Sequence, residues 1–182
     1  MPVRVQREDF DAGAEIARLR QGDAKVGAVA AFIGVARDLN DGKSVATLSL
    51  EHYPGMTERA LDGIVVEARM RWRLIDALVI HRIGALKPTD QIVLVAVTGE
   101  HRGEAFAACE FIMDYLKTRA PFWKKETTSS GERWVEARCS DDQAASRWTR
   151  NRDGANPSDP SDPSDERDVS AAGEPARKTH VG

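Results

Sequence analysis

The segment 101–125 constrains the fold of this chain more than any other. Its apolar residues recur at spacings of three and four, which predicts an amphipathic helix over 103–117 with one buried stripe, formed by Phe106, Cys109, Ile112, Met113 and Leu116. Pro121 ends the helix because its ring cannot continue the hydrogen-bonding pattern. The apolar run 91–98 precedes this segment and reads as a strand. A strand followed by a long helix therefore forms the centre of the predicted fold.

Basic side chains lie at both ends of this predicted helix. His101 and Arg102 stand at its start, where unpaired backbone N–H groups and the helix dipole already favour an anion. At the other end, nine residues without an acid contain Phe122, Trp123 and four cations: Lys117, Arg119, Lys124 and Lys125. A helix C-terminus requires fewer cations than this to neutralise its dipole. Lysines this close can depress one another's pKa, leaving one neutral and nucleophilic or keeping one charged as an acid.

The remaining segments predict further helices and strands. Asp9 or Asp11 caps a first helix, and Thr57 caps a second. The predicted strands are a buried one over 26–35 that runs to Arg37, one over 45–50, a hairpin of 77–83 with 91–98, and a hairpin that flanks 129–131. In the last hairpin Phe122, Lys124 and Glu126 share one face, and Ser140 caps a final helix. Paired adjacent strands indicate an α+β fold, with a mainly antiparallel sheet and packed helices of an α/β-hammerhead-like kind.

Residues 151–182 differ from the rest in composition. They repeat Pro, Ser and Asp with almost no large apolar side chain, which predicts a disordered tail without a catalytic role after a single domain over 1–150. The tail holds four basic and seven acidic residues, so it accounts for the whole formal net charge of −3. A neutral body argues against nonspecific binding to nucleic acid or membrane. Any anion site must therefore be local.

Several classes of enzyme lose support because their motifs are absent from the sequence. It contains no G-x-G-x-x-G or Walker sequence, no G-x-S-x-G elbow, and no cluster of Cys or His at metal-ligand spacing. We expect neither a metal nor a cofactor. Cys109 and Cys139 suit a reducing compartment, and Cys109 reads as a small core residue in mid-helix. No run approaches the ~18 apolar residues of a membrane span, so a cytoplasmic protein is expected.

Three stretches closely resemble the large, catalytic subunit of molybdopterin synthase: LEHYPGMTERAL, the EHR that opens the central helix, and FIMDYLKTRAPFWKKE followed by RWVEAR. The resemblance covers roughly 3–148 and is most specific in MDYLKTRAPFWK. It implies a sulfurtransferase of molybdenum cofactor biosynthesis that converts cyclic pyranopterin monophosphate into molybdopterin. The sulfur donor would be a thiocarboxylate on the C-terminal glycine of a small ubiquitin-like subunit. The implied assembly is a homodimer with a small subunit at each end, which makes a heterotetramer.

The resemblance also implies the site residues. The family's essential lysines fall on Lys117 and Lys124, and its other pocket residues fall on Arg37, His101 and Arg102 as anion-holding groups, Phe32 and Met113 near the pocket, and Arg138 in the late strand. A lysine beside the thiocarboxylate can orient it, stabilise developing negative charge, or protonate a leaving oxygen. Which lysine does which is left open.

The spacing of these residues bears on how one pocket could contain them all. His101 and Lys117 are 16 residues apart, which corresponds to about 24 Å along a helix. A compact pterin would hardly bridge that distance within one chain. We therefore predict a composite pocket with Lys117 and Lys124 from one protomer. Its other cations, His101 and Arg102, would come from the dimer mate, with Arg37 grouped on the mate's side.

Two rival functions stay open at this level. The chain could be a noncatalytic module that only binds a ubiquitin-like tail. It could also bind single-stranded RNA through Lys117, Lys124 and Lys125 with Phe122 and Trp123, because cations beside stacking aromatics are suited to single strands. The neutral body and the expected burial of both aromatics argue against RNA.

Overall fold

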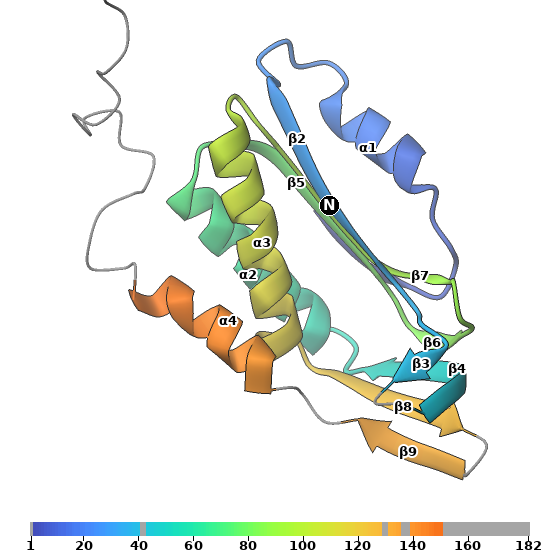
Figure 1. Cartoon of the computed structure of the whole chain (residues 1–182). Coiled ribbons are helices and arrows are strands. Elements are labelled where there is room, and N and C mark those ends of the chain that lie inside the picture. The colour runs from blue at the N-terminus through green and yellow to red at the C-terminus, as the bar shows by residue number, and fades with distance from the viewer. Residues whose placement is uncertain (1, 41–42, 129–130, 136–138, 151–182) are drawn as a thin grey trace, which may run out of the picture.

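The computed structural model describes residues 2–40, 43–128, 131–135 and 139–150 (Figure 1). The predicted tail over 151–182 and the site residue Arg138 lie outside these ranges. In chain order the elements are β1 (Val3–Gln6), α1 (Ala12–Arg20), β2 (Ala28–Val35), β3 (Leu39–Asn40), β4 (Lys43–His52), α2 (Met56–Arg71), β5 (Leu74–Arg82), β6 (Gly84–Leu86), β7 (Gln91–Gly99), α3 (Arg102–Arg119), β8 (Phe122–Thr128), β9 (Gly131–Val135) and α4 (Cys139–Arg150).

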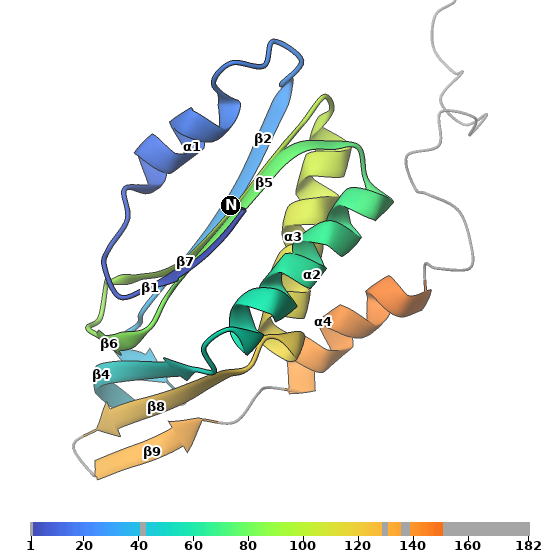
Figure 2. The same ribbon diagram turned by 180° about the vertical axis from the view of Figure 1, so that it is seen from behind.

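The first sheet has helices on both faces. Its strand order is β1-β5-β7-β2, in which only the β1–β5 pair is parallel. Successive side chains of a strand point to opposite faces, so Leu78 and Ile80 of β5 pack under α1, whereas Ala77 and Val79 join the larger core under α2 and α3. Figure 2 shows α1 on one side of this sheet and α2 and α3 on the other. The predicted α+β class with mainly antiparallel pairing is confirmed.

The second sheet contains β8, the strand that follows α3 in the chain. Its strands run in the order β3-β4-β8-β9, and β6 also pairs with β4. The predicted hairpins are confirmed, because β5 pairs with β7 and β8 pairs with β9, both antiparallel. The two sheets meet where the ring of His81 on β5 stacks on Phe122 at the start of β8, with centroids 3.8 Å apart. The end of α3 is therefore tied to both sheets.

The central helix forms where it was predicted and extends slightly further at each end. Cys109, Ile112, Met113 and Leu116 are buried as expected, but Phe106 is 65% exposed, so its place in the buried stripe was wrong. The buried face instead turns toward α2 and α4, because Phe111 and Tyr115 pack there among Trp72 and Trp148.

The helix ends agree with the sequence only in part. Of the two candidate caps for α1 it is Asp11 that acts, its Oδ1 accepting the N–H of Ala14 at 2.9 Å. Helix α4 begins at Cys139, so Ser140 lies inside the helix and is not its cap. No helix in the described ranges is long and apolar enough to cross a membrane.

Strand β2 was predicted to be buried, and this was wrong for most of its side chains. Four of them, Val29, Phe32, Ile33 and Val35, are 37–46% exposed. The reason is its position, because β2 pairs with β7 on one side and forms an edge of the first sheet. Apolar side chains are therefore exposed on both faces of this edge strand, although Ala30 is buried.

Candidate active site

Lys117 lies at the C-terminal end of α3, where α4 crosses it. Its side chain is half exposed, and its Nζ lies 3.3 Å from Oδ1 of Asp141 in the first turn of α4. Asp141 is more enclosed, with 22% of its side chain exposed. The ammonium group is therefore accessible and is held by a carboxylate from another element.

Lys124 follows α3 on strand β8 and has a buried partner. Its Nζ lies 2.9 Å from Glu126 Oε1, two residues along the same face of the strand, as the alternation predicted. Glu126 is only 1% exposed, and its other oxygen accepts hydrogen bonds from the Arg133 guanidinium of β9 at 2.9 and 3.1 Å. A buried carboxylate is stable only when it is paired and hydrogen-bonded. Lys124 and Arg133 both pair with Glu126, and this buried carboxylate holds the ammonium group of Lys124 in place.

The cations at the other end of α3 are arranged differently. His101 is the N-cap residue, and its side chain and that of Arg102 are exposed. Neither side chain makes a hydrogen bond or ion pair with any residue in the described ranges. Gly27, which precedes β2, packs closely against this turn. A Cβ at this position would collide with the Glu100 carbonyl oxygen. The free cations and the helix N-terminus together suit an anion such as a phosphate.

Arg37 lies at the opposite end of β2 from His101. Ala28 of β2 pairs with Gly99, whereas Val35 pairs with Gln91 at the far end of β7. Eight strand residues span about 25 Å, so within one chain Arg37 does not lie beside His101 and Arg102. Ala36 packs instead with Leu50, the register partner of Lys124. Within one chain Arg37 therefore belongs to the same end of the molecule as the two lysines.

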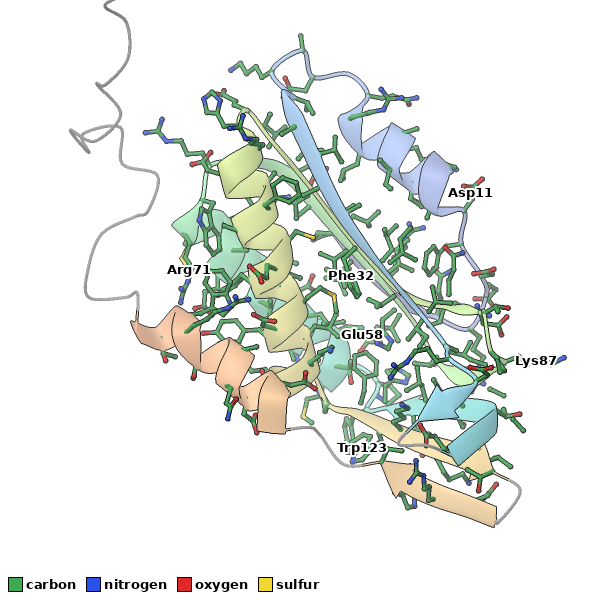
Figure 3. All side chains as sticks on the ribbon, viewed as in Figure 1. Asp11, Phe32, Glu58, Arg71, Lys87 and Trp123 are labelled. Carbon is green, nitrogen blue, oxygen red and sulfur yellow. The ribbon has the colours of Figure 1, made fainter. Side chains whose placement is uncertain are left out.

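Phe32 and Met113 occupy different environments near these cations. Phe32 lies on β2 (Figure 3) and is 42% exposed, whereas Met113 on α3 is buried in the core. Phe122 is partly buried, but Trp123 on β8 (Figure 3) is exposed to 46%, so the expected burial of both aromatics was wrong for Trp123. Arg138, the remaining predicted site residue, lies outside the described ranges.

Cys109 is not placed for chemistry. Burial raises the pKa of the Cys109 thiol to about 11, with a further contribution from the charge of Glu110. Its Sγ contacts the carbonyl oxygen of Val95 at 3.9 Å, inside the core. The thiol is therefore protonated at neutral pH, which agrees with its assignment as a core residue. Within the described ranges no three His, Cys, Asp or Glu side chains are grouped to hold a metal ion.

The sequence did not identify the carboxylates that hold the lysines. It did place Glu126 on the same strand face as Lys124, because the two residues are two positions apart in a predicted strand. Asp141 carried no such signal, since it is 24 residues from Lys117 and meets it only through the packing of two helices. The site thus combines lysines held by carboxylates at one end of α3 with cations at the other end that have no partner among the described residues.

The fold and the site together define an α+β protein with clusters of cations at both ends of one central helix. The sequence matches the family described as MoaE protein over residues 5–119. A molybdopterin synthase catalytic subunit from Ralstonia nicotianae is 67% identical over 146 residues, which are 80% of this chain and 83% of that protein. The chain belongs to the MoaE family.

Solved structures agree with this assignment. The molybdopterin biosynthesis MoaE protein from Burkholderia ambifaria MC40-6 superposes with a TM-score of 0.70 at 58% identity, covering 81% of this chain and 97% of that one. A complex of subunits 1 and 2 of molybdopterin-converting factor from Helicobacter pylori shares the fold, with a TM-score of 0.62 at 19% identity, covering 76% and 92%. The predicted family, the sulfurtransferase class and the function as a molybdopterin synthase catalytic subunit are confirmed.

Proposed function

We propose that this chain transfers sulfur from the C-terminal thiocarboxylate of a small ubiquitin-like subunit to cyclic pyranopterin monophosphate, and so forms the dithiolene of molybdopterin. Family membership supports the reaction, and the two groups of cations support the residue assignment. The observation that carries it is the contrast between Lys117 and Lys124, which are held by carboxylates, and His101 and Arg102, which have no partner in the described ranges. Fixed lysines suit the reacting groups, and free cations suit the phosphate.

The two lysines have the properties that the sulfur-transfer step needs. A thiocarboxylate is an anion. Its carbonyl oxygen gains further negative charge when a nucleophile adds to the carbonyl carbon. Charged groups that are already in position stabilise such charge without reorganising during the reaction. Lys117 is accessible from solvent, and Lys124 is tied to the buried Glu126. We assign the sulfur-transfer step to these two lysines and the binding of the substrate phosphate to His101, Arg102 and Arg37.

The exposed apolar edge of β2 supports a homodimer. An open strand edge with apolar side chains on both faces is unusual in a protein that stays monomeric. A two-fold axis near the middle of β2 would set two such edges against each other in antiparallel fashion. Val35 of one copy would then lie opposite the Ala28 end of the other. Pairing of two copies would therefore cover the four exposed side chains of β2.

This arrangement would also complete the pocket. The Arg37 end of β2 lies on the side of Lys124, and the Ala28 end lies beside the turn that carries His101. Antiparallel apposition thus brings Arg37, Lys117 and Lys124 of one copy toward His101 and Arg102 of the other. Each dimer would hold two composite pockets, with Phe32 at the edge between the copies. Arg138 is retained as a pocket residue on the strength of the resemblance.

The small-subunit partner follows from the family and from the two-subunit complex of the Helicobacter pylori protein. One small subunit at each end of the dimer would make a heterotetramer, and the assembly would work in the cytoplasm. A single-turnover assay tests this function directly, with purified protein, a thiocarboxylated small subunit and cyclic pyranopterin monophosphate. Dithiolene product with wild type, and none with Lys117→Ala that still binds both partners, would support sulfur transfer. Tail binding without product in wild type would indicate a noncatalytic binding module instead.

Mixing two inactive variants tests the composite pocket. Lys117→Ala and Arg102→Ala protomers are each expected to be nearly inactive as homodimers at low precursor concentration, because every pocket then lacks either a reacting lysine or a phosphate-binding cation. Random exchange at equal amounts leaves about a quarter of all pockets intact. Recovery of about a quarter of wild-type activity is therefore expected. No recovery, although mass spectrometry shows mixed dimers, would mean that each pocket lies within one chain.

A further inference from the structure

Helix α4 is fixed to α3 by a group of side chains in its second half. Trp148 is 9% exposed, and its Nε1–H donates to Asp114 Oδ2 of α3 at 2.7 Å. The same carboxylate oxygen accepts from Arg147 Nη2 at 2.6 Å, and the Trp148 ring packs edge-on against Phe111 with centroids 5.5 Å apart. From α2, Arg71 Nη1 donates to the Trp148 carbonyl at 3.0 Å. The position of α4 on α3 is therefore set by several directional contacts.

The register of α4 then determines where Asp141 lies. Asp141, Ala145 and Trp148 are spaced by four and three residues, so they line one face of α4, and Ala145 and Trp148 are both buried. On α3, Asp114 and Lys117 are three residues apart and share a face in the same way. The two faces meet, with Trp148 on Asp114 and Asp141 on Lys117 at 3.3 Å. The contact at Lys117 thus results from the packing of two helices.

We propose that Asp141 is a positioning residue for Lys117, which rests on the catalytic role proposed above for that lysine. A free lysine samples many side-chain rotamers, and each of them has to be given up when the ammonium group acts on a substrate. The carboxylate of Asp141, carried by a helix that is itself fixed, holds the ammonium group at the end of α3 before substrate arrives. The expected gain is in the rate of the chemical step, because preorganisation lowers the barrier without adding a contact to the substrate.

A simpler role for Asp141 is to interact favourably with the helix dipole, and the chain provides a control for it. Asp142 is the adjacent residue in the same first turn of α4 and is exposed. It has the same charge and the same relation to the dipole. Asp142→Asn therefore removes an acidic charge from the same helix end and leaves the contact between Asp141 and Lys117 in place.

The test compares Asp141→Asn, Asp141→Glu and Asp142→Asn in the complex with the thiocarboxylated small subunit. Asp141→Asn is expected to lower the single-turnover rate at saturating precursor by about tenfold, with the apparent Kd for the precursor unchanged. Asp141→Glu should restore most of the rate, and Asp142→Asn should match wild type. A wild-type rate in Asp141→Asn, an equal loss in Asp142→Asn, or no rescue by Asp141→Glu would overturn the proposal.

A second measurement reads the contact without relying on activity. Acylation of Lys117 by an N-hydroxysuccinimide ester, followed by mass spectrometry, should be at least about twofold faster in Asp141→Asn than in wild type or Asp142→Asn, because the ammonium loses its charged partner. Equal rates in all three proteins would overturn the positioning role. If Lys117→Ala keeps full activity, the proposed catalytic role fails, and the acylation result still decides whether Asp141 holds Lys117.

Discussion

The two ends of α3 carry similar charges in different structural settings. At the C-terminal end Lys117, Arg119 and Lys124 each have a carboxylate partner, respectively Asp141, Glu67 and Glu126. At the N-terminal end the side chains of His101 and Arg102 have no such partner within the described ranges. The residue types alone would not distinguish the two ends. The difference lies in the carboxylates packed beside them, because Glu67 of α2, Asp141 of α4 and Glu126 of β8 all lie at the C-terminal end.

This difference separates cations that stabilise the fold from cations that are available to a ligand. A cation with a buried acid contributes to folding, and removing either partner leaves an uncompensated charge. An exposed cation without a partner contributes little to folding and can be changed at small cost in stability. The free energy of unfolding should therefore respond strongly to substitutions at the C-terminal end and weakly at the N-terminal end.

The largest effect is expected at Glu126, whose carboxylate lies between Lys124 and Arg133. Glu126→Ala leaves both cations without this buried acid, and we expect a loss of about 3–5 kcal/mol in the free energy of unfolding, measured by urea denaturation. Glu132→Ala serves as the control, because Glu132 is 59% exposed in its ion pair with Lys125. A loss at Glu126 no larger than the loss at Glu132 would show that the C-terminal end is not held by this carboxylate.

The next effect is a dependence of stability on pH, and it arises at the stacked rings of His81 and Phe122, where the two sheets meet. Burial lowers the pKa of His81 to about 4, and the ring stacks on Phe122 while its Nδ1 lies 2.8 Å from the Arg82 carbonyl oxygen. In the unfolded chain the imidazole titrates at its ordinary pKa of about 6.5. Between these values the unfolded state binds more protons, so stability falls as the pH is lowered from 6.5 to 4. The loss from this group is at most about 3 kcal/mol.

Urea denaturation across this pH range tests that expectation. His81→Phe should remove this part of the pH dependence, because no proton can bind at the position. His52→Gln is the matched control, since His52 lies nearby with its Nε2 3.5 Å from Glu58. If the acid loss persists unchanged in His81→Phe, another group causes it, and the stack does not determine how stability at this end responds to acid.

Much of the fold was predictable because local rules determined it. The apolar spacing over 103–117 predicted α3, and turn residues between apolar runs predicted both hairpins. The errors concern which surfaces are covered. Phe106 satisfies the helical spacing, but α2 and α4 pack on the other flank, and the sequence does not specify that packing. The run 26–35 is as apolar as a central strand, and only the strand order makes it an edge.

The candidate site was predictable in its cations and not in their partners. The resemblance identified the two lysines, and helix length separated them from His101. The place of Arg37 depended on the register of β2 against β7, which pairs Val35 with Gln91 and could not be read from either strand alone. Likewise Asp141 meets Lys117 only because Trp148 fixes the register of α4 on α3. Contacts that depend on the packing of several elements therefore stayed hidden.

A smaller effect is expected at Cys109, midway between the two ends. Cys109→Ala removes one buried sulfur and should cost about 1 kcal/mol in the free energy of unfolding. Its single-turnover rate should equal that of wild type, because a thiol with a pKa of about 11 is protonated at neutral pH. Loss of sulfur transfer in a folded Cys109→Ala protein would show that the chemistry extends along α3 and is not confined to its ends.

The smallest effect on stability is expected at Arg102, and it is the sharpest test of the comparison. Arg102→Ala should change the free energy of unfolding by no more than about 0.5 kcal/mol, because the side chain is exposed and makes no ion pair in the described ranges. Arg119→Ala is the matched change at the other end. There the guanidinium lies 3.1 Å from Glu67 and 3.5 Å from the centre of the Tyr115 ring, so a loss of about 1 kcal/mol is expected.

The affinity for cyclic pyranopterin monophosphate should rank the two variants in the opposite order. A cation that binds the substrate phosphate contributes one or more charge-assisted hydrogen bonds, so Arg102→Ala should weaken binding by at least about tenfold. Arg119→Ala should bind like wild type, because its guanidinium is already engaged by Glu67 and Tyr115. Calorimetry with the precursor measures this, with inorganic phosphate as a competitor. Equal losses of affinity in both variants would mean that pairing within the chain does not distinguish ligand-binding cations from structural ones, and the contrast between the two ends of α3 would lose its functional meaning.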